Sequence, residues 1–239
     1  MITVDFSRLT VKPGFKILDV GCGSGRHTSA AYRFKKVVAV GADLKFKDLT
    51  EASERLKLHD RLGEHGGGVW GLTAANIVSL PFKDDCFDLV ICSEVLEHIQ
   101  DYFQAIREIV RVLKAGCNLV VSVPRYWPER ICWALSTDYH TAKGGHLRIF
   151  TQAQLVADLQ TAGVRAWARH YAHSLHTPYW WLKCLVGPGR EDCRPVNLYH
   201  RFLTWDIMKQ PRSTHLLDHL LNPFLGKSIV LYFRKMKSS

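Results

Sequence analysis

The chain has 239 residues, 47% of them hydrophobic, a mean hydropathy of -0.07 and a formal net charge of +10 at pH 7. These values indicate a globular protein with a substantial core, built as one α/β domain with an elaboration or as two small domains. No uncharged apolar run approaches the roughly 18 residues of a membrane span, the N-terminus shows no apolar signal segment, and the seven cysteines form no C-x-x-C pair, so we expect a reduced, cytoplasmic chain.

Short apolar runs alternate with helical patterns from residue 16 to about residue 161, which is typical of βαβ units and a parallel sheet. The five strands predicted in this part span residues 16–20, 37–40, 69–74, 87–92 and 118–123, each rich in Val, Ile or Leu. The clearest helix covers residues 102–113 and is expected to end at Lys114-Ala115-Gly116. A helix over 152–162, a strand over 164–170 and a final strand over 227–235 follow.

Three glycines follow the first predicted strand in the stretch ILDVGCGSGRHT, residues 17–28. Gly21, Gly23 and Gly25 lead into a helix expected to begin near Ser24. This arrangement directs free backbone N–H groups and the positive end of a helix dipole at a ligand, and glycine permits a close approach of the backbone. The G-x-G-x-G spacing differs from the G-x-G-x-x-G of dinucleotide sites, so no pyrophosphate is required.

An acidic residue ends the second predicted strand, in VVAVGADLK. Asp43 follows Gly25 by 18 residues, and a carboxylate in this place accepts hydrogen bonds from both hydroxyls of a ribose. The glycines and Asp43 together therefore predict a ligand that contains a ribose, and NAD remains open on these two features alone.

The next segment, NIVSLPFKDDCFDLVICSEVLEHI, covers residues 76–99. Together with LDVGCGSG, VGADL and REIVRVLKAG, it resembles the class I S-adenosylmethionine-dependent methyltransferases, and in LPF, FDLV and LEH especially those of quinone biosynthesis. The resemblance extends over about residues 14–165, with the motifs in the expected order. It implies a doubly wound, seven-stranded, mostly parallel α/β sheet that binds S-adenosylmethionine at the carboxyl ends of its strands.

The resemblance also implies roles for individual residues. The methionine part of the cofactor would be surrounded by Asp19, Gly21, Gly23 and Gly25. Asp43 would bind the ribose and Leu44 would lie against the adenine, which Asn76 and Ile77 would flank; Ser93 or Glu94 would line the cofactor near the sulfonium. The family usually has Asp where this chain has Asn76, whose amide oxygen still accepts a hydrogen bond. A second departure, Ala115-Gly116-Cys117 in place of Pro-Gly-Gly, is expected in a turn.

Candidates for handling the acceptor follow the fifth strand. His140 and His146 are expected in a glycine-containing loop, where either could take a proton from a hydroxyl or an enol, or make structural hydrogen bonds only. The predicted acceptor pocket comprises His98, Tyr126, Trp127, Tyr179, Trp180 and Trp181, although His98 also suits support of a helix start. His170, His173 and His176 recur every three residues, but without a nearby carboxylate they predict no metal site and are expected around the acceptor entrance.

The long interruption before the last strand requires structure of its own. We predict a methyltransferase core of residues 1–170 and 227–239, with residues 171–226 inserted as a helical, aromatic-rich cap over the acceptor. The aromatic residues beside Lys and Arg form an apolar pocket or a satellite core, and they suit peripheral contact with an anionic membrane surface.

Three functions are compatible with these features. The first is methyl transfer from S-adenosylmethionine to an oxygen or carbon of a small hydrophobic acceptor, either aromatic, quinone-like or isoprenoid. The second is tRNA nucleoside methylation, because residues 140–239 hold 14 Lys and Arg against five Asp and Glu. It ranks lower because these basic residues are dispersed singly and no RNA-binding module is appended. The third is a cofactor-binding protein that has lost catalysis; no feature specifies the oligomeric state.

Overall fold

A computed structural model describes residues 2–142 and 144–237. Its seven strands form one sheet in the order β3-β2-β1-β4-β5-β7-β6. The strands are β1 (Lys16–Val20), β2 (Val38–Asp43), β3 (Val69–Ala74), β4 (Phe87–Ser93), β5 (Leu113–Pro124), β6 (Val164–Ala172) and β7 (Ser228–Lys235). Neighbouring strands are parallel except where β7 pairs with β5 and β6. The predicted seven-stranded, mostly parallel α/β sheet is confirmed.

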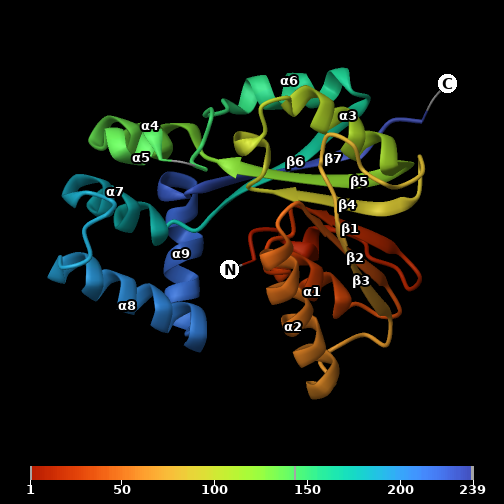
Figure 1. Ribbon diagram of the computed structural model, residues 1–239, viewed down its shortest axis with the longest axis horizontal. Helices are drawn as coiled ribbons and strands as arrows, with labels where there is room; N and C mark the ends of the chain where they lie inside the picture. Colours follow the sequence, from red (N-terminus) through yellow and green to blue (C-terminus); the bar gives the residue numbers. More distant parts are fainter. Residues whose placement is uncertain (1, 143, 238–239) are drawn as a thin grey trace.

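Helices cover both faces of this sheet, as Figure 1 shows. One face carries α1 (Arg26–Tyr32), α2 (Phe46–Leu62) and the N-terminal segment with the short 3-10 helix η1 (Phe6–Arg8), and the other carries α3 (Tyr102–Val112) and α6 (Gln152–Thr161). The central strands are apolar because both of their faces are buried: Leu18, Val90 and Val121 are fully buried. The strand order reverses between β1 and β4, and α/β sheets bind ligands at the carboxyl ends of the strands at such a point.

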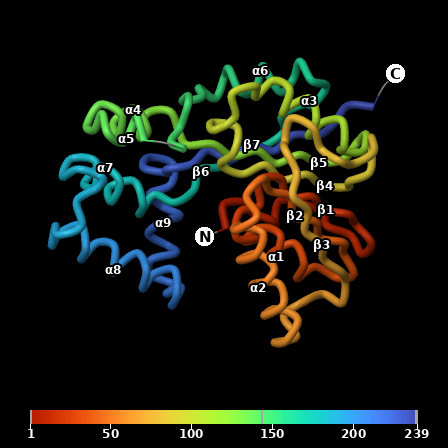
Figure 2. The backbone as a smooth tube through the Cα atoms, in the orientation of Figure 1, coloured from red at the N-terminus to blue at the C-terminus, as the bar shows by residue number. Residues whose placement is uncertain are grey.

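A second group of helices gathers at the end of the sheet where β5 ends (Figures 1 and 2). It consists of α4 (Tyr126–Leu135), α5 (Thr137–Thr141), α7 (His176–Val186), α8 (Arg194–Lys209) and α9 (Arg212–Leu225). Helix α4 packs against α5 and α7, α7 against α8, and α9 against β6. We call these five helices the cap. It includes α4 and α5, which lie outside the predicted insertion of residues 171–226.

Three local predictions were wrong. Helix α1 begins at Arg26 rather than near Ser24, because Gly25 has a left-handed φ of 74° that no helix continues. Ala115-Gly116-Cys117, expected in a turn, lies within β5 at an irregularity of its pairing with β4: α3 ends at Val112, and the extended Leu113 already pairs with Phe87. His140, expected in a glycine-containing loop, lies instead in helix α5. Helix α4 before it was not predicted, and Pro128 is tolerated there because it lies in the first turn.

The histidines at residues 170 and 173 hold the N-terminal segment on the sheet. His170 Nε2 bonds the carbonyl oxygen of Thr3 at 3.2 Å, and His173 Nε2 lies 3.1 Å from the Thr3 hydroxyl. The backbone N–H of Thr3 donates to Nε2 of buried His27 at 3.0 Å. His170, His173 and His176 also line a cavity together with Thr3, and their expected place around the acceptor entrance stays a prediction.

No helix within residues 2–142 and 144–237 has both the length and the apolar content needed to cross a bilayer. All seven cysteines lie in this part of the chain and carry free thiols.

Candidate functional site

The glycine loop between β1 and α1 has a backbone that only glycine adopts without strain. Gly21, Gly23 and Gly25 have φ angles of 68°, 50° and 74°. A Cβ on Gly21 would lie 2.4 Å from Cγ2 of Val95, and one on Gly25 would lie 2.8 Å from Cβ of Ala52, whereas one on Gly23 would meet no atom within 4 Å. Gly21 and Gly25 therefore serve close packing, and Gly23 borders open space.

Asp43 is the last residue of β2 and fixes the glycine loop from the neighbouring strand. Its Oδ2 accepts the backbone N–H of Gly23 at 2.8 Å, and its Oδ1 accepts that of Lys45 at 2.9 Å. Each carboxylate oxygen keeps a second lone pair, so both can still accept hydroxyl hydrogen bonds. Leu44 and Phe46 next to it are 70% and 78% exposed. A carboxylate beside uncovered apolar side chains suits a ribose joined to a flat base.

The structure places three other predicted cofactor residues at different depths. Asn76 is exposed, and its Oδ1 accepts the N–H of Val78 at 3.2 Å, while Ile77 belongs to the core. Asp19 is fully buried; its Oδ2 accepts both the N–H and the hydroxyl of Thr28, at 2.9 and 2.7 Å. Burial raises the pKa of Asp19 to about 6. Asp19 thus acts on the loop by holding the first turn of α1 against β1.

Glu94 follows β4 directly and has a strained backbone. Its φ of 57° is left-handed, which is costly for a residue with a Cβ. The N–H of Glu94 donates to the carbonyl of Ser122 at 2.9 Å, the Ser122 hydroxyl donates to Glu94 Oε1 at 3.0 Å, and the Ser93 and Ser122 hydroxyls lie 2.8 Å apart. These bonds between the ends of β4 and β5 hold Glu94 in place, with Val95 against the glycine loop.

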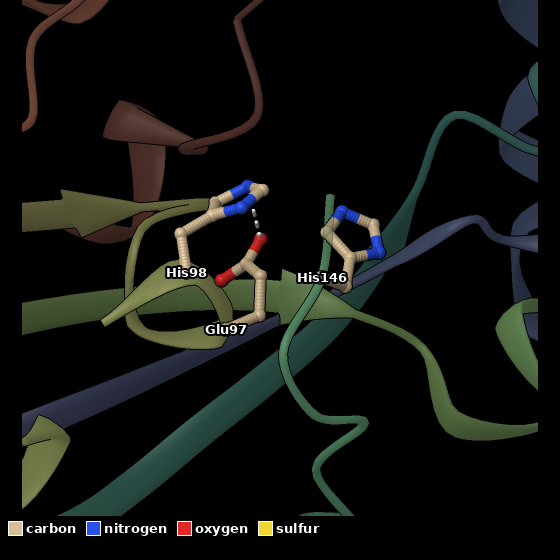
Figure 3. Close-up of side chains that lie close together, drawn as sticks. All are labelled: Glu97, His98 and His146. Carbon is tan, nitrogen blue, oxygen red and sulfur yellow. Dashed lines mark ion pairs between the residues drawn. The ribbon is translucent and has the colours of Figure 1, made fainter. Parts of the chain in front are cut away.

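Beyond Glu94, four side chains form a polar cluster that we call the Glu–His cluster: Glu97, His98, Glu129 and His146. Glu97 and His98 come from the 3-10 helix η2 (Leu96–His98), and His146 lies across from them, before α6, as Figure 3 shows. Nδ1 of His146 bonds Oε1 of Glu129 on α4 at 2.5 Å, and Nδ1 of His98 bonds the carbonyl oxygen of Gly145 at 3.1 Å.

The pKa values of the two carboxyl groups of this cluster are shifted in opposite directions. Glu97 is fully buried, and its two carboxylate oxygens have no hydrogen-bond partner within the described residues. Burial and then the nearby charge of Glu94 raise the pKa of Glu97 well above its usual value. Burial is also the largest single influence on the pKa of Glu129 and acts to raise it, but the hydrogen bond and charge of His146, with the charge of Lys227, together leave that pKa below its usual value.

The predicted acceptor aromatics divide into two groups. The rings of Trp127 on α4 and Trp181 on α7 lie 5.6 Å apart. The ring of Trp180 lies 5.7 Å from that of Tyr139 on α5, which in turn lies 6.3 Å from the ring of His146. The other residues point elsewhere: Tyr126 is 43% exposed, Tyr179 stacks on Tyr199 of α8, and the exposed His140 stacks on Trp133. The structure thus brings His98 and His146 together and links them to Trp180 through Tyr139. Trp127 and Trp181 form a pair between α4 and α7, two residues along α4 from Glu129, and His140 stays outside this group.

Glu97 and Glu129 were not predicted from the sequence as members of this site. The pattern Glu94-x-x-Glu97-His98 directly after a strand was a usable signal for the first, because a 3-10 turn returns the second carboxylate to the strand end. Glu129 gave no signal, since it lies on a helix that the sequence did not predict.

The glycine geometry predicts that Gly21→Ala and Gly23→Ala fail differently. Gly21→Ala combines a left-handed φ with a clash against Val95, so we expect the free energy of unfolding to fall by about 2–3 kcal/mol. Gly23→Ala adds strain alone, about 1 kcal/mol, but its Cβ projects into the open space of the loop. Urea unfolding and titration calorimetry with S-adenosylmethionine measure both effects. Unchanged affinity in Gly23→Ala would show that the ligand does not use this space.

Comparisons with known proteins agree with this geometry. Residues 18–121 match the family model described as "Methyltransferase domain". The chain is 32% identical over 120 residues to methyltransferase GfsG of Streptomyces halstedii, covering 49% of this chain and 40% of that protein. It is 35% identical over 112 residues to demethylmenaquinone methyltransferase of Lysinibacillus sphaericus, covering 47% and 45%. The chain therefore spans less than half the length of these curated relatives.

The fold is that of class I methyltransferases along the whole chain. A crystal structure of a putative methyltransferase from Bacillus halodurans matches with a TM-score of 0.60 and 20% identity, covering 97% of each chain. The resemblance seen in the sequence motifs is confirmed, and the part that carries it contains the glycine loop, Asp43 and the η2 segment.

Proposed function

We propose that this chain, whose residues 18–121 belong to the methyltransferase-domain family, is an S-adenosylmethionine-dependent methyltransferase that acts on a small hydrophobic acceptor. One observation carries the proposal: the glycine loop, Asp43 and the strained Glu94 converge at the reversal point of the sheet, next to the Glu–His cluster and the cap tryptophans.

Binding of the methyl donor is supported by the open space at Gly23 and by the acceptor capacity of Asp43. Asp43 would accept hydrogen bonds from the ribose hydroxyls, and the exposed Leu44 would cover the adenine. The donor supplies a methyl group already activated on a sulfonium. The contribution of the protein is therefore mainly to hold the acceptor in line with that methyl group and to exclude water.

An acceptor that arrives protonated also needs a base. His146 is the better placed of the two predicted histidines, because Glu129 accepts its Nδ1–H and thereby leaves Nε2 free to take a proton. His140 lies on α5 against Trp133 and would reach an acceptor only after moving.

A hydrophobic acceptor is supported by the cap tryptophans and by one relative, which is named for a quinone substrate. The cap also leaves large apolar side chains of α8 and α9 at least 45% exposed: Leu198, Trp205, Met208, Leu216, Leu217, Leu220 and Phe224. Residues 216, 217, 220 and 224 share one face of α9 at helical spacing, and Arg201 shares a face of α8 with Leu198 and Trp205. Such apolar faces beside cations suit contact with an anionic membrane that holds the acceptor.

The proposal is tested with S-adenosylmethionine labelled on its methyl group. The purified protein is incubated separately with lipids in anionic vesicles, with phenolic metabolites and with RNA. We expect label in the lipid or phenolic fraction and none with Asp43→Ala. Absence of label from both fractions, while the donor binds, would contradict a hydrophobic acceptor.

A tRNA acceptor is the second candidate, and one observation favours it. A cavity of about 920 Å³ lies between the N-terminal segment, helices α1 and α2, and α9. Its arginines are Arg8, Arg26, Arg33, Arg55 and Arg169. Phosphate groups would bind such a surface with strong salt dependence. Label in the RNA fraction, with a tRNA gel shift that weakens as salt rises, would select this function instead.

A further inference from the structure

The Glu–His cluster contains three side chains that can each ligate a metal ion, whereas proton transfer needs a single base. One side-chain atom each from Glu97, His98 and His146 lies within 4.8 Å of the other two. His146 is 48 residues from His98 in the chain and faces it across the cluster (Figure 3). Ligand atoms around a tetrahedral ion with bonds of about 2.1 Å lie roughly 3.4 Å apart. A contraction of about 1.4 Å or less would therefore bring all three atoms onto one ion.

The tautomers of both histidines leave the same nitrogen available. A carbonyl oxygen only accepts, so Nδ1 of His98 carries the proton in its bond to Gly145; Nδ1 of His146 likewise donates to the Glu129 carboxylate. Nε2 of each ring is then an unprotonated electron-pair donor. A ligating histidine in metalloproteins almost always donates its other ring N–H to a carboxylate or a carbonyl in this way.

Glu97 supplies the independent observation that a ligand belongs here. Its side chain is fully buried, and both of its oxygens lack a hydrogen-bond partner within residues 2–142 and 144–237. Buried carboxylates are normally hydrogen-bonded, paired or coordinated to a metal, because desolvation without compensation is costly. Nε2 of His98 is 4.0 Å from Glu97 Oε1, which is too long for a hydrogen bond and suits two ligands of one ion.

We propose that Glu97, His98 and His146 bind a divalent transition-metal ion, with Glu129 as the carboxylate that orients His146. Two imidazoles and one carboxylate favour zinc, iron or manganese over magnesium or calcium. Three protein ligands leave at least one coordination position open, and η2, which carries two of them, adjoins the glycine loop through Val95.

The role of the ion rests on the proposed function, but its binding does not. An acceptor hydroxyl in the open position would release its proton to solvent near neutral pH, as a metal-bound water does. The acceptor oxygen would then form its bond to the methyl carbon as the sulfur–carbon bond breaks, leaving a neutral thioether. His146 would then be a ligand and not the base.

The test is metal binding to the full chain after dialysis against EDTA. Titration with Zn²⁺ followed by calorimetry, and with Co²⁺ followed by visible absorption, should give one equivalent with micromolar or tighter affinity. Glu97→Gln and His146→Gln should each weaken it at least 100-fold, and Glu129→Gln 10- to 100-fold. Near-UV circular dichroism shows whether the variants fold. If Glu97→Gln does not fold, His146→Gln alone provides the test.

His219→Ala is the matched control, because His215 and His219 lie one turn apart on α9 and form an ordinary surface site for added zinc. Loss of binding in His219→Ala but not in Glu97→Gln or His146→Gln would overturn the proposal, as would the absence of an equivalent of bound metal. Failure of the proposed function is seen separately: metal would still bind while S-adenosylmethionine would not. Donor binding and full methyl transfer by EDTA-treated protein would leave the function standing and remove the catalytic role of the ion.

Discussion

Asp43→Ala is expected to weaken S-adenosylmethionine binding at least 100-fold in titration calorimetry. The substitution removes two charge-assisted acceptor sites for ribose hydroxyls, each worth about 1.5–3 kcal/mol. It also releases the N–H of Gly23, which the carboxylate holds at 2.8 Å, so the glycine loop loses its connection to β2. Asp43→Asn keeps one acceptor oxygen and should lie between the wild type and the alanine variant.

The matched control is Glu51→Ala, which removes an exposed carboxylate from α2 without touching the loop. Thermal unfolding followed by circular dichroism shows whether Asp43→Ala keeps its fold. Wild-type affinity in a folded Asp43→Ala protein would mean that Asp43 does not bind the ribose.

The second large effect is a proton-linked loss of stability at His27. Burial lowers the pKa of His27 to about 4, against about 6.5 in an unfolded chain, and its Nε2 must stay unprotonated to accept the N–H groups of Thr3 and Val4. The unfolded chain therefore binds the extra proton between pH 6.5 and 4, so the stability that this group contributes is present above pH 6.5 and is lost as pH falls. From pH 7 to 4.5 the loss is about 2 kcal/mol.

Other buried groups, including Asp19 and His176, also titrate between about pH 4 and 6.5. The prediction therefore concerns the difference in pH dependence between the wild type and a variant that lacks His27. His27→Gln retains an acceptor oxygen for the Thr3 N–H but has no proton to gain. In urea unfolding, the free energy of unfolding of His27→Gln should decrease less steeply with falling pH than that of the wild type. The two slopes should differ by about 1 kcal/mol per pH unit between pH 4.5 and 6. The exposed His219→Gln should follow the wild type. Parallel profiles for wild type and His27→Gln would refute the linkage.

The sheet was predictable because its signals are local. Strands buried on both faces must be continuous apolar runs, so β1 had the predicted bounds, and β2 and β5 were found but were longer than predicted. The edge strand β3 also had the predicted bounds, although none of its residues is buried. The contact between the glycine loop and Asp43 was predictable for a related reason: a tight turn after a strand requires glycine, and Asp43 is placed beside it by its position at the end of the next strand.

The acceptor side was less predictable because it depends on long-range contacts. The bond between His146 and Glu129 joins a loop to a helix whose proline and aromatic residues hid its periodicity. In the sequence, Glu97 is only the middle residue of the LEH motif. Its importance follows from its burial without a hydrogen-bond partner, which only the structure shows. The contacts of the histidines at 170 and 173 were equally hidden: their regular spacing gave no sign that both bond Thr3, 167 and 170 residues away in the chain.

The cap is assembled from two separate excursions of the chain, one between β5 and β6 and one between β6 and β7. Apart from Glu97 and His98, the residues proposed to meet the acceptor come from these excursions, whereas those proposed to hold the donor come from the alternating units that precede them. Under the proposed function, substrate choice and methyl supply would be encoded in separable blocks of sequence. Exchanging both excursions together should redirect the enzyme to a new acceptor, while exchanging either one alone would pair α4 with a foreign α7 and expose the tryptophans between them.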